Sequence, residues 1–215
     1  MKVLVGCEYS GIVRDAFIKQ GFDAWSCDLL ESESGGNHYK CDVLDIINDG
    51  WDLGIFHPPC TRLCNSGVVW LEERNLWKEL DKSALFFKTL YESPIPNIAI
   101  ENPIPHKYAL QRISYNYKQI IQPYMFGHKE RKATCLWLKN LPELIPTRNM
   151  YYEMLKLPKN QQQRLHYLPP SEDRWKERSK TFTGIADAMA EQWGDYIING
   201  SKQLSLWEFL ENPGL

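Results

Sequence analysis

The sequence lacks the features of a membrane or secreted protein. No apolar run approaches the ~18–20 residues that a membrane-spanning helix needs, and the apolar start of the chain meets the polar side chain of Glu8 too early for a signal peptide. Six cysteines among 215 residues are too few for a disulfide scaffold. No second pair with zinc-finger spacing follows Cys60 and Cys64. We therefore expect a cytoplasmic protein with free thiols, no metal site and no contact with a membrane.

An excess of charge of one sign is also missing. The chain has 25 Lys and Arg against 27 Asp and Glu, a net charge of −2. This balance excludes a uniformly cationic nucleic-acid-binding coat, although a local basic face remains open. A hydrophobic fraction of 43% and a charged fraction of 24% are typical of a folded globular domain. The length predicts one domain, with at most a small appendage.

The first hundred residues alternate between strand and helix patterns. Apolar runs typical of buried strands occupy residues 2–5, 23–27, 51–56 and 97–100. One helix pattern is capped by Ser10 and ends at Gly21, and a longer one runs from Leu76 to Tyr91. Residues 31–40 are predicted to form a loop. This alternation predicts an α/β fold, a Rossmann-like, mostly parallel sheet with helices on both faces.

The second half has a different pattern. Residues 133–138 are predicted to form a strand in a more antiparallel region, after a turn at Gly127 and His128. Residues 146–180 are irregular and rich in Pro, Gln, Lys and Arg, which predicts a small basic insertion. A final helix is predicted to start at Gly184.

Polar or reactive side chains follow each strand of the predicted sheet. Ligands bind at the carboxyl ends of strands in open parallel sheets. The groups at these ends are Cys7-Glu8-Tyr9-Ser10-Gly11, then Asp28 with Asp42 after the next short element, then Pro58-Pro59-Cys60, and finally Glu101-Asn102-Pro103. Turns collect polar residues in any protein, but four strand ends on one edge together predict a binding site.

The first two strand ends favour a nucleoside cofactor. A carboxylate such as Asp28 can accept hydrogen bonds from both hydroxyls of a ribose. The first turn has only Gly11 where a dinucleotide-binding fingerprint has three glycines. The sequence thus argues against a pyrophosphate site and favours a cofactor without phosphates, for which S-adenosylmethionine is the candidate.

The next two strand ends favour covalent chemistry on a ring. Two prolines hold Cys60 on a stiff loop, and the N-terminus of the following helix is predicted to lower the pKa of its thiol. The carboxyl group of Glu101 could hydrogen-bond or protonate a ring nitrogen while the thiolate attacks a ring carbon. A buried structural cysteine and a salt-bridging glutamate are the structural alternatives.

The order of these elements resembles the DNA cytosine-C5 methyltransferase family, and most of all its short phage-type members. The matching stretches span residues 2 to about 200. They are His57-Pro58-Pro59-Cys60-Thr61, Ile100-Glu101-Asn102-Pro103, Cys135-Leu136-Trp137-Leu138-Lys139 and Gly184-Ile185-Ala186-Asp187-Ala188-Met189. The first loop departs from the family pattern Phe-x-Gly-x-Gly, and Ile185 stands where the family prefers Asn.

The resemblance implies a methyltransferase-type fold in a bacterial or phage-infected host cell, with DNA carrying a flipped cytosine as the partner. Cys60 would add to C6 of the base and Glu101 would hydrogen-bond or protonate N3. Either Arg131 or Lys132 would neutralise the base carbonyl or a phosphate, and the motif fits both. Implied cofactor-binding residues are Cys7, Glu8, Tyr9, Ser10, Gly11, Asp28, Asp42 and Pro58. Implied substrate-binding residues are Pro59, Asn102, Lys132 and Thr134.

The same resemblance divides the chain into a catalytic domain of residues 1–145 and 181–200, a target-contacting segment of residues 146–180, and a C-terminal tail of residues 201–215. The segment has eight basic residues against four acidic ones. Aromatic residues lie between them, as expected for phosphate contacts and base stacking. An ordinary solvated loop is the alternative. So short a segment predicts low sequence specificity, or help from a partner.

Two functions of other classes compete with this reading. Exocyclic amino-methyltransferases also use a Pro-Pro loop, but with Asp, Asn or Ser before it and an aromatic residue after it, where this chain has His57 and Cys60. A catalytically silent nucleic-acid-binding relative would have lost the nucleophile or the acid, yet Cys60 and Glu101 are both present. RNA or a modified base stays open as the substrate.

Overall fold

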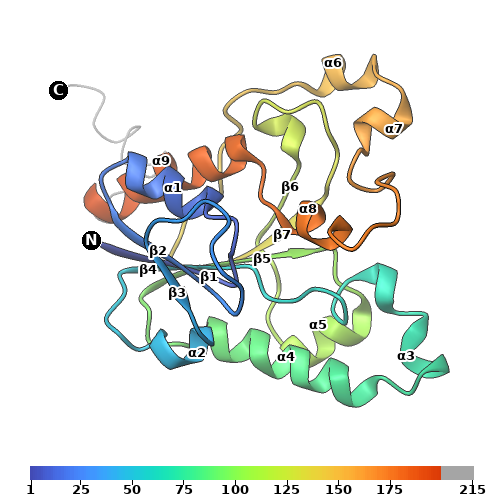
Figure 1. Ribbon diagram of the computed structural model, residues 1–215, viewed down its shortest axis with the longest axis horizontal. Helices are drawn as coiled ribbons and strands as arrows, with labels where there is room; N and C mark the ends of the chain where they lie inside the picture. The colour runs from blue at the N-terminus through green and yellow to red at the C-terminus, as the bar shows by residue number, and fades with distance from the viewer. Residues whose placement is uncertain (200–215) are drawn as a thin grey trace, which may run out of the picture.

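The computed structural model describes residues 1–199, so the predicted tail of residues 201–215 lies outside the described residues. One seven-stranded sheet forms the centre of the fold, in the order β3-β2-β1-β4-β5-β7-β6 (Figure 1). The strands are β1 Lys2–Gly6, β2 Asp23–Asp28, β3 His38–Lys40, β4 Leu53–Phe56, β5 Asn97–Pro103, β6 Gln119–Ile121 and β7 Thr134–Lys139.

Parallel pairing joins β3, β2, β1, β4 and β5, whereas β7 runs antiparallel to both β5 and β6. The predicted fold class, a mostly parallel α/β sheet with helices on both faces, is thereby confirmed. Central strands such as β4 are buried at every residue, as expected when helices cover both faces of a sheet.

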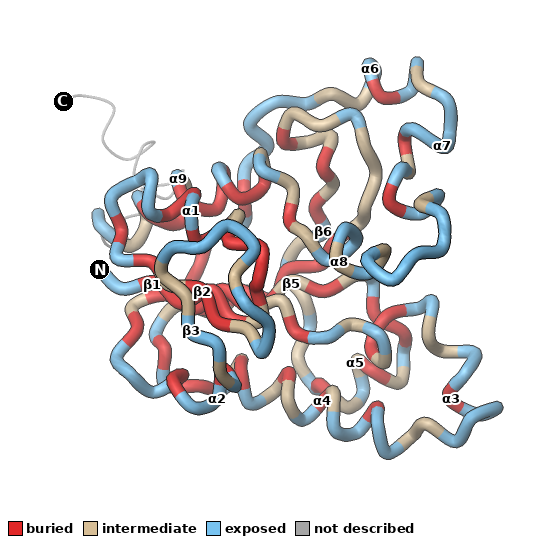
Figure 2. Tube along the Cα trace, viewed as in Figure 1, coloured by how far each residue is buried: buried red, intermediate tan, exposed pale blue. Residues whose placement is uncertain are grey.

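Helices cover the two faces of the sheet in separate groups (Figure 1). On one face lie α1 Ile12–Lys19 and α9 Thr183–Asn199, which pack against each other. The opposite face carries α2 Val43–Ile46, α4 Trp77–Tyr91 and α5 Lys107–Ile113. The buried residues, red in Figure 2, accordingly form two apolar clusters, one on each side of the sheet. Within residues 1–199, no helix is both long and apolar enough to span a bilayer.

Several predicted boundaries were wrong. The predicted loop at residues 31–40 ends in β3, and β6 was not predicted, because three-residue strands carry too little periodicity to detect. Strand β5 continues through Glu101, Asn102 and Pro103, where a strand end was expected, since β7 pairs with these residues. The irregular segment 146–180 contains three short helices, α6 Tyr151–Leu155, α7 Lys159–Gln162 and α8 Arg174–Ser179.

Trp193 joins α9 to the rest of the core. Its side chain is fully buried, and its indole N–H donates a hydrogen bond to the carbonyl oxygen of Pro142 at 3.0 Å. Next to it, Gly194 leaves room for Phe22, because a Cβ at residue 194 would lie 2.8 Å from the Phe22 ring. The packing of α9 on this face therefore depends on the large side chain of Trp193 and on the lack of a side chain at Gly194.

Replacing Trp193 by alanine should lower the free energy of unfolding by about 3–5 kcal/mol, because the cavity cannot close around a removed indole. Urea unfolding measures the change. The matched control Trp193→Phe keeps most of the ring packing and should lose clearly less. An alanine variant within about 1 kcal/mol of the native chain would show that α9 is not held by this contact.

Candidate functional site

Four neighbouring strands place the predicted site residues on one edge of the sheet. Strands β2, β1, β4 and β5 are adjacent and parallel, so the residues at their carboxyl ends are neighbours. Gly6 pairs with both Cys27 and Phe56, and Phe56 pairs with Ile100. The chain reverses its winding direction between β1 and β4, which is where open α/β sheets bind ligands.

At the β1 and β2 ends, Cys7, Asp28 and Asp42 gather. Burial, together with the charges of Asp28 and Asp42, raises the pKa of the Cys7 thiol to about 12, so the three groups act on one another. Asp28 accepts a hydrogen bond from the backbone N–H of Leu30 at 2.9 Å. Asp42 is exposed and caps α2 through the N–H of Leu44 at 3.0 Å. Their cofactor roles stay predictions.

The carboxylate of Glu8 caps α1, a role that the sequence had suggested for Ser10. Glu8 is buried, and it accepts hydrogen bonds from the backbone N–H groups of Val13 at 2.8 Å and Arg14 at 3.3 Å. Ser10 contributes less, accepting from the N–H of Ile12 at 3.3 Å while its hydroxyl donates to Glu8. Because a side chain already occupies these amides, the helix N-terminus offers no phosphate site. A cofactor without phosphates fits this loop.

Gly11 and Tyr9 complete the first loop. Gly11 has a φ of 76°, and a Cβ there would lie 2.3 Å from the guanidinium group of Arg14, so the position requires glycine. The backbone carbonyl of Tyr9 accepts a hydrogen bond from the backbone N–H of Glu33. The centre of the Tyr9 ring lies 6.0 Å from that of Trp175 in α8. The loop thus contacts the basic segment directly.

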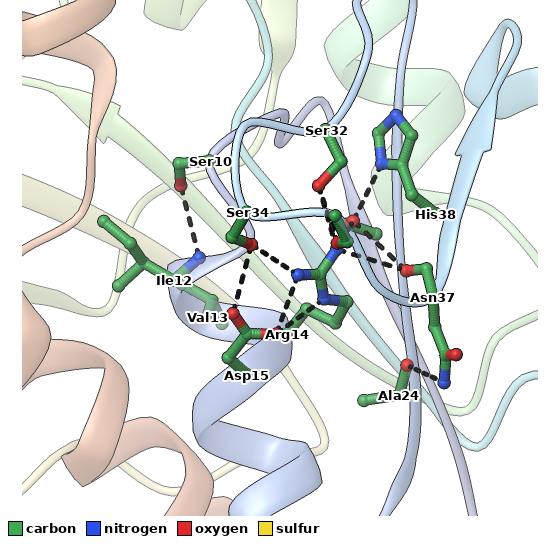
Figure 3. A network of polar contacts seen from close by, with 12 residues as sticks. Ser10, Ile12, Val13, Arg14, Asp15, Ala24, Ser32, Ser34, Asn37 and His38 are labelled. Atoms are coloured by element: carbon green, nitrogen blue, oxygen red, sulfur yellow. Dashed lines mark hydrogen bonds and ion pairs between the residues drawn. The ribbon is translucent and has the colours of Figure 1, made fainter.

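The buried side chain of Arg14 fixes the loop that follows β2, and sequence reasoning did not identify it (Figure 3). Its guanidinium group donates to the hydroxyls of Ser26 at 2.9 Å and Ser34 at 2.6 Å, and pairs with Asp15 at 2.7 Å. A buried charge is tolerated only when its hydrogen bonds are satisfied. The loop beside Asp28 is therefore held in one conformation by α1.

Cys60 lies at the end of β4 in a tight turn. Pro58 is buried, Pro59 is exposed and Cys60 is half-buried, and the carbonyl oxygen of Cys60 accepts hydrogen bonds from Leu63 at 2.9 Å and Cys64 at 3.0 Å. The expected helix N-terminus beside Cys60 was wrong. Only a three-residue 3-10 turn at Asn65–Gly67 and the four-residue α3, Trp70–Glu73, follow within this region.

The thiols of Cys60 and Cys64 perturb each other's pKa. The backbone N–H of Cys64 donates to the carbonyl oxygen of Cys60 at 3.0 Å, so both side chains leave the same turn. The Cys60 side chain, and then the Ser66 hydroxyl that lies 3.0 Å from the Cys64 sulfur, lower the pKa of Cys64 to about 5. Interaction with Cys64, together with burial, raises the pKa of Cys60. The expected lowering of the pKa of Cys60 was therefore wrong: of the two thiols, Cys64 is the one whose pKa is lowered.

The loop after Cys60 is tied to the chain after Glu101 by His106. The Nε2 atom of His106 lies 2.9 Å from the carbonyl oxygen of Arg62, and its backbone N–H donates to Leu63 at 3.1 Å. Its Nδ1 accepts from the N–H of Ala109 at 3.0 Å, which caps α5 and makes Nε2 the donor. Sequence reasoning missed His106, since the only signal is a histidine just before a helix.

Glu101 is buried at the end of β5 and is held by three groups. Its side chain is 11% exposed. Its Oε2 lies 3.2 Å from Nδ1 of His57 and accepts from the hydroxyl of Thr181 at 3.4 Å, and its Oε1 lies 4.0 Å from the ammonium group of Lys132. Burial raises the pKa of Glu101, but the His57 hydrogen bond and the Lys132 charge outweigh it and lower the pKa to about 2. Glu101 is ionised.

Lys132 is thus the cation that the structure brings to Glu101. The backbone N–H of Arg131 donates to Gln162, and its side chain forms no hydrogen bond or ion pair within residues 1–199. Two further predicted site residues bond to the nearby backbone. The Thr134 hydroxyl donates to the carbonyl oxygen of Lys132, and the Asn102 side-chain amide donates to the carbonyl oxygen of Pro103. The Oδ1 atom of Asn102 is buried without a partner in the described structure.

A separate cavity of about 400 Å³ lies at the turn before the final helix. It is lined by Gly127, His128, Arg148, Gly184 and Asp187, among others, and by none of the predicted site residues. A Cβ on Gly184 would lie 1.9 Å from the carbonyl oxygen of Phe126, which explains the glycine.

No family model matches the chain, and no curated protein matches it in sequence. It is similar in structure to a putative DNA modification methyltransferase encoded within an E. coli prophage, with a TM-score of 0.45 and 15% identity over 74% of this chain and 56% of the other. The Entamoeba histolytica methyltransferase EhMeth has a TM-score of 0.45 and 16% identity, over 69% of this chain and 57% of the other. A Spodoptera frugiperda DNMT2 mutant has a TM-score of 0.38 and 14% identity, over 69% of this chain and 53% of the other. The chain spans little more than half of each.

Replacing Cys64 by alanine should remove about one thiolate equivalent at pH 7, because Cys64 carries the charge of the pair and Cys60 keeps its proton. The ultraviolet absorbance of thiolate measures it. The control Cys135→Ala should change nothing at this pH, since burial raises the pKa of Cys135 to about 11. Equal absorbance in both variants would contradict the shared charge.

Proposed function

We propose that this chain transfers a methyl group to C5 of cytosine in DNA through a covalent bond to Cys60. The observation that carries the proposal is that the turn holding Cys60 and Cys64 follows β4, while the Glu101 carboxylate, with its lowered pKa, lies on the adjacent strand β5. Nucleophile and proton-handling group must flank one ring for this reaction. The register of β4 on β5 supports this arrangement, because Phe56 pairs with Ile100, Glu101 follows Ile100 directly, and Cys60 follows Phe56 by four residues.

The chemistry begins with a target cytosine outside the base stack, since its ring carbons are not accessible within a duplex. The Cys60 sulfur bonds to C6, and its proton passes to the Cys64 thiolate in the same turn, so a raised pKa of Cys60 does not prevent attack. Glu101 handles the proton at N3, and Lys132 neutralises negative charge that develops on the ring. After methylation a water molecule accepts the C5 proton, the electrons of the C5–H bond restore the C5–C6 double bond, and the C6–S bond breaks. The released Cys60 sulfur takes back its proton from Cys64.

The residues at the β1 and β2 ends fit S-adenosylmethionine. Asp28 would hold the ribose hydroxyls and Asp42 the adenine amino group. The occupied N-terminus of α1 suits a cofactor that has no phosphates. When bound, the cofactor supplies the methyl group, while Pro58 forms part of the wall between it and the base.

Residues 146–180 are proposed to contact the DNA backbone. Their aromatic side chains Tyr152, Tyr167 and Trp175 are exposed. Some of the basic residues are already paired, Lys176 with Asp173 and Lys180 with Glu33 and Glu177. Arg164 pairs with Glu130, and Arg174 donates to the carbonyl oxygen of His166. The remaining four form no ion pair and no side-chain hydrogen bond within residues 1–199: Arg148, Lys156, Lys159 and Arg178. These four are the candidates for phosphate contacts.

A DNA duplex containing 5-fluorocytosine should trap a covalent complex in the presence of S-adenosylmethionine, because fluorine at C5 cannot leave as a cation. Cys60→Ser should abolish the adduct, and Glu101→Gln should slow its formation by about 10²–10⁴-fold, the usual value of a proton-transferring group. Denaturing electrophoresis measures both.

Trapping also separates the competing functions. Methyl transfer without any adduct would favour an amino-methyltransferase, and DNA binding without methyl transfer would favour a silent relative. An adduct with single-stranded RNA but not with DNA would show that the substrate is RNA, while the proposed covalent mechanism would stand.

Replacing Lys156 and Lys159 together by alanine should weaken DNA binding equally for all sequences. The slope of log affinity against log salt concentration should fall by about 2, because each phosphate contact contributes about 0.9. Fluorescence anisotropy at several salt concentrations measures the slope. The matched control is Lys78→Ala with Lys82→Ala, two exposed lysines of α4 on the opposite face. Equal slopes for both pairs would contradict the assigned interface.

A further inference from the structure

We propose that His57 is a positioning residue that stores the proton used by Glu101, so that the two side chains act as one proton-carrying pair. The inference rests on the proposed function and adds a residue to it. His57 is the last residue before Pro58-Pro59-Cys60, and β4 pairs Phe56 with Ile100, so His57 lies beside Glu101 and directly precedes the loop that holds the nucleophile.

The contact geometry gives His57 one clear partner. Its Nδ1 lies 3.2 Å from Oε2 of Glu101, and both side chains are almost fully buried. The Nε2 atom is buried and has no hydrogen-bond partner in the described part of the chain. A buried polar atom without a partner is destabilising, and such atoms are retained where a ligand or a reaction uses them. No other protein group therefore draws the proton away from Glu101.

Charges around the pair favour its ionised form. Burial lowers the pKa of His57, but the hydrogen bond and charge of Glu101, followed by the charge of Glu8 from the β1 loop, raise it above its usual value. Lys132, from the segment before β7, opposes this and lowers it. The lowered pKa of Glu101 and the raised pKa of His57 both favour a carboxylate paired with an imidazolium ion, in which His57 holds the proton.

This arrangement resolves a difficulty of the proposed reaction, in which an ionised Glu101 has no proton to donate. As the Cys60 sulfur bonds to C6, electrons of the C5–C6 double bond move toward N3 and its basicity rises. The proton then moves from Nδ1 of His57 to Glu101. The carboxyl group rotates about its Cγ–Cδ bond and donates the proton to N3. When the sulfur leaves, N3 returns the proton to Glu101 and His57, so the cycle consumes none.

The two oxygens of Glu101 suit these steps. Oε2 faces both His57 and Thr181, whereas Oε1 has Lys132 at 4.0 Å and accepts no hydrogen bond within residues 1–199. The place of Oε1 is therefore the one open to the base, and the protonated Oε2 takes that place when the carboxyl group rotates. The Lys132 ammonium group is close enough to stabilise charge there without occupying the hydrogen-bonding position.

The test is the pH dependence of methylation and of adduct formation in His57→Asn, whose amide can still donate to Glu101 but cannot titrate. In the native enzyme both rates should fall as the pH rises through the raised pKa of His57. The Asn variant should be about 10²-fold slower and should lack this alkaline decline, with the KM for DNA unchanged. His57→Phe, which removes the hydrogen bond as well, should lose the same pH dependence.

The outcomes separate the two proposals. A purely structural role predicts that Asn restores the native rate and pH profile while Phe does not, and that result would overturn the inference alone. If the native chain forms neither 5-methylcytosine nor an adduct, both the proposed function and the proton store are wrong. Native activity with a native profile in both variants would likewise remove His57 from the mechanism.

Discussion

The buried negative charge of Glu101 is the constraint on which the site depends. A carboxylate removed from water is destabilising unless charged and polar partners surround it. The partners come from three distant parts of the chain: His57 after β4, Lys132 before β7, and Thr181 before α9. The second half of the sequence must therefore fold against the end of the parallel sheet before this charge is stable. The candidate site around Glu101 is therefore assembled only when the second half of the chain has folded.

Strand pairing and one histidine set the distances around that charge. Glu101 pairs with Leu136 across the β5–β7 ladder, so the antiparallel strand carries Lys132 past the carboxylate in a fixed register. His106 then joins the turn after Cys60 to the segment after β5. Nucleophile and carboxylate are thereby fixed to the same framework, as preorganised catalysis requires. Arg14 does the same for the loop beside Asp28.

The pattern of the sequence was enough to predict the parallel half of the fold and the edge at which the site lies. Strand runs such as residues 51–56 are apolar and bounded by turn residues, which is a local signal. The three-residue strands β3 and β6, and the extension of β5 through Glu101, come from pairing with distant strands and leave no local pattern. The resemblance to a family could identify Cys60 and Glu101 because each lies in a short continuous motif, which is also a local signal in the sequence.

Properties that arise from contacts between separate segments could not be predicted. The Cys60 thiol was expected to be ionised by a helix, but the lowered pKa is that of Cys64, through the Cys60 side chain and then the contacts of Ser66 and Gly67. Which of Arg131 and Lys132 lies beside Glu101 could be decided only from the folded structure, in which the Lys132 ammonium group is the near one. Likewise, Thr181 and His106 are ordinary residues in the sequence, and only the folded chain turns them toward the site.

The most direct measurement is mass spectrometry of the nucleosides released from genomic DNA of cells that express this chain, with a strain expressing an inactive variant as the background. The account predicts 5-methylcytosine above that background and no other new methylated base. The appearance of 4-methylcytosine or 6-methyladenine instead, or of no methylated base at all, would contradict it.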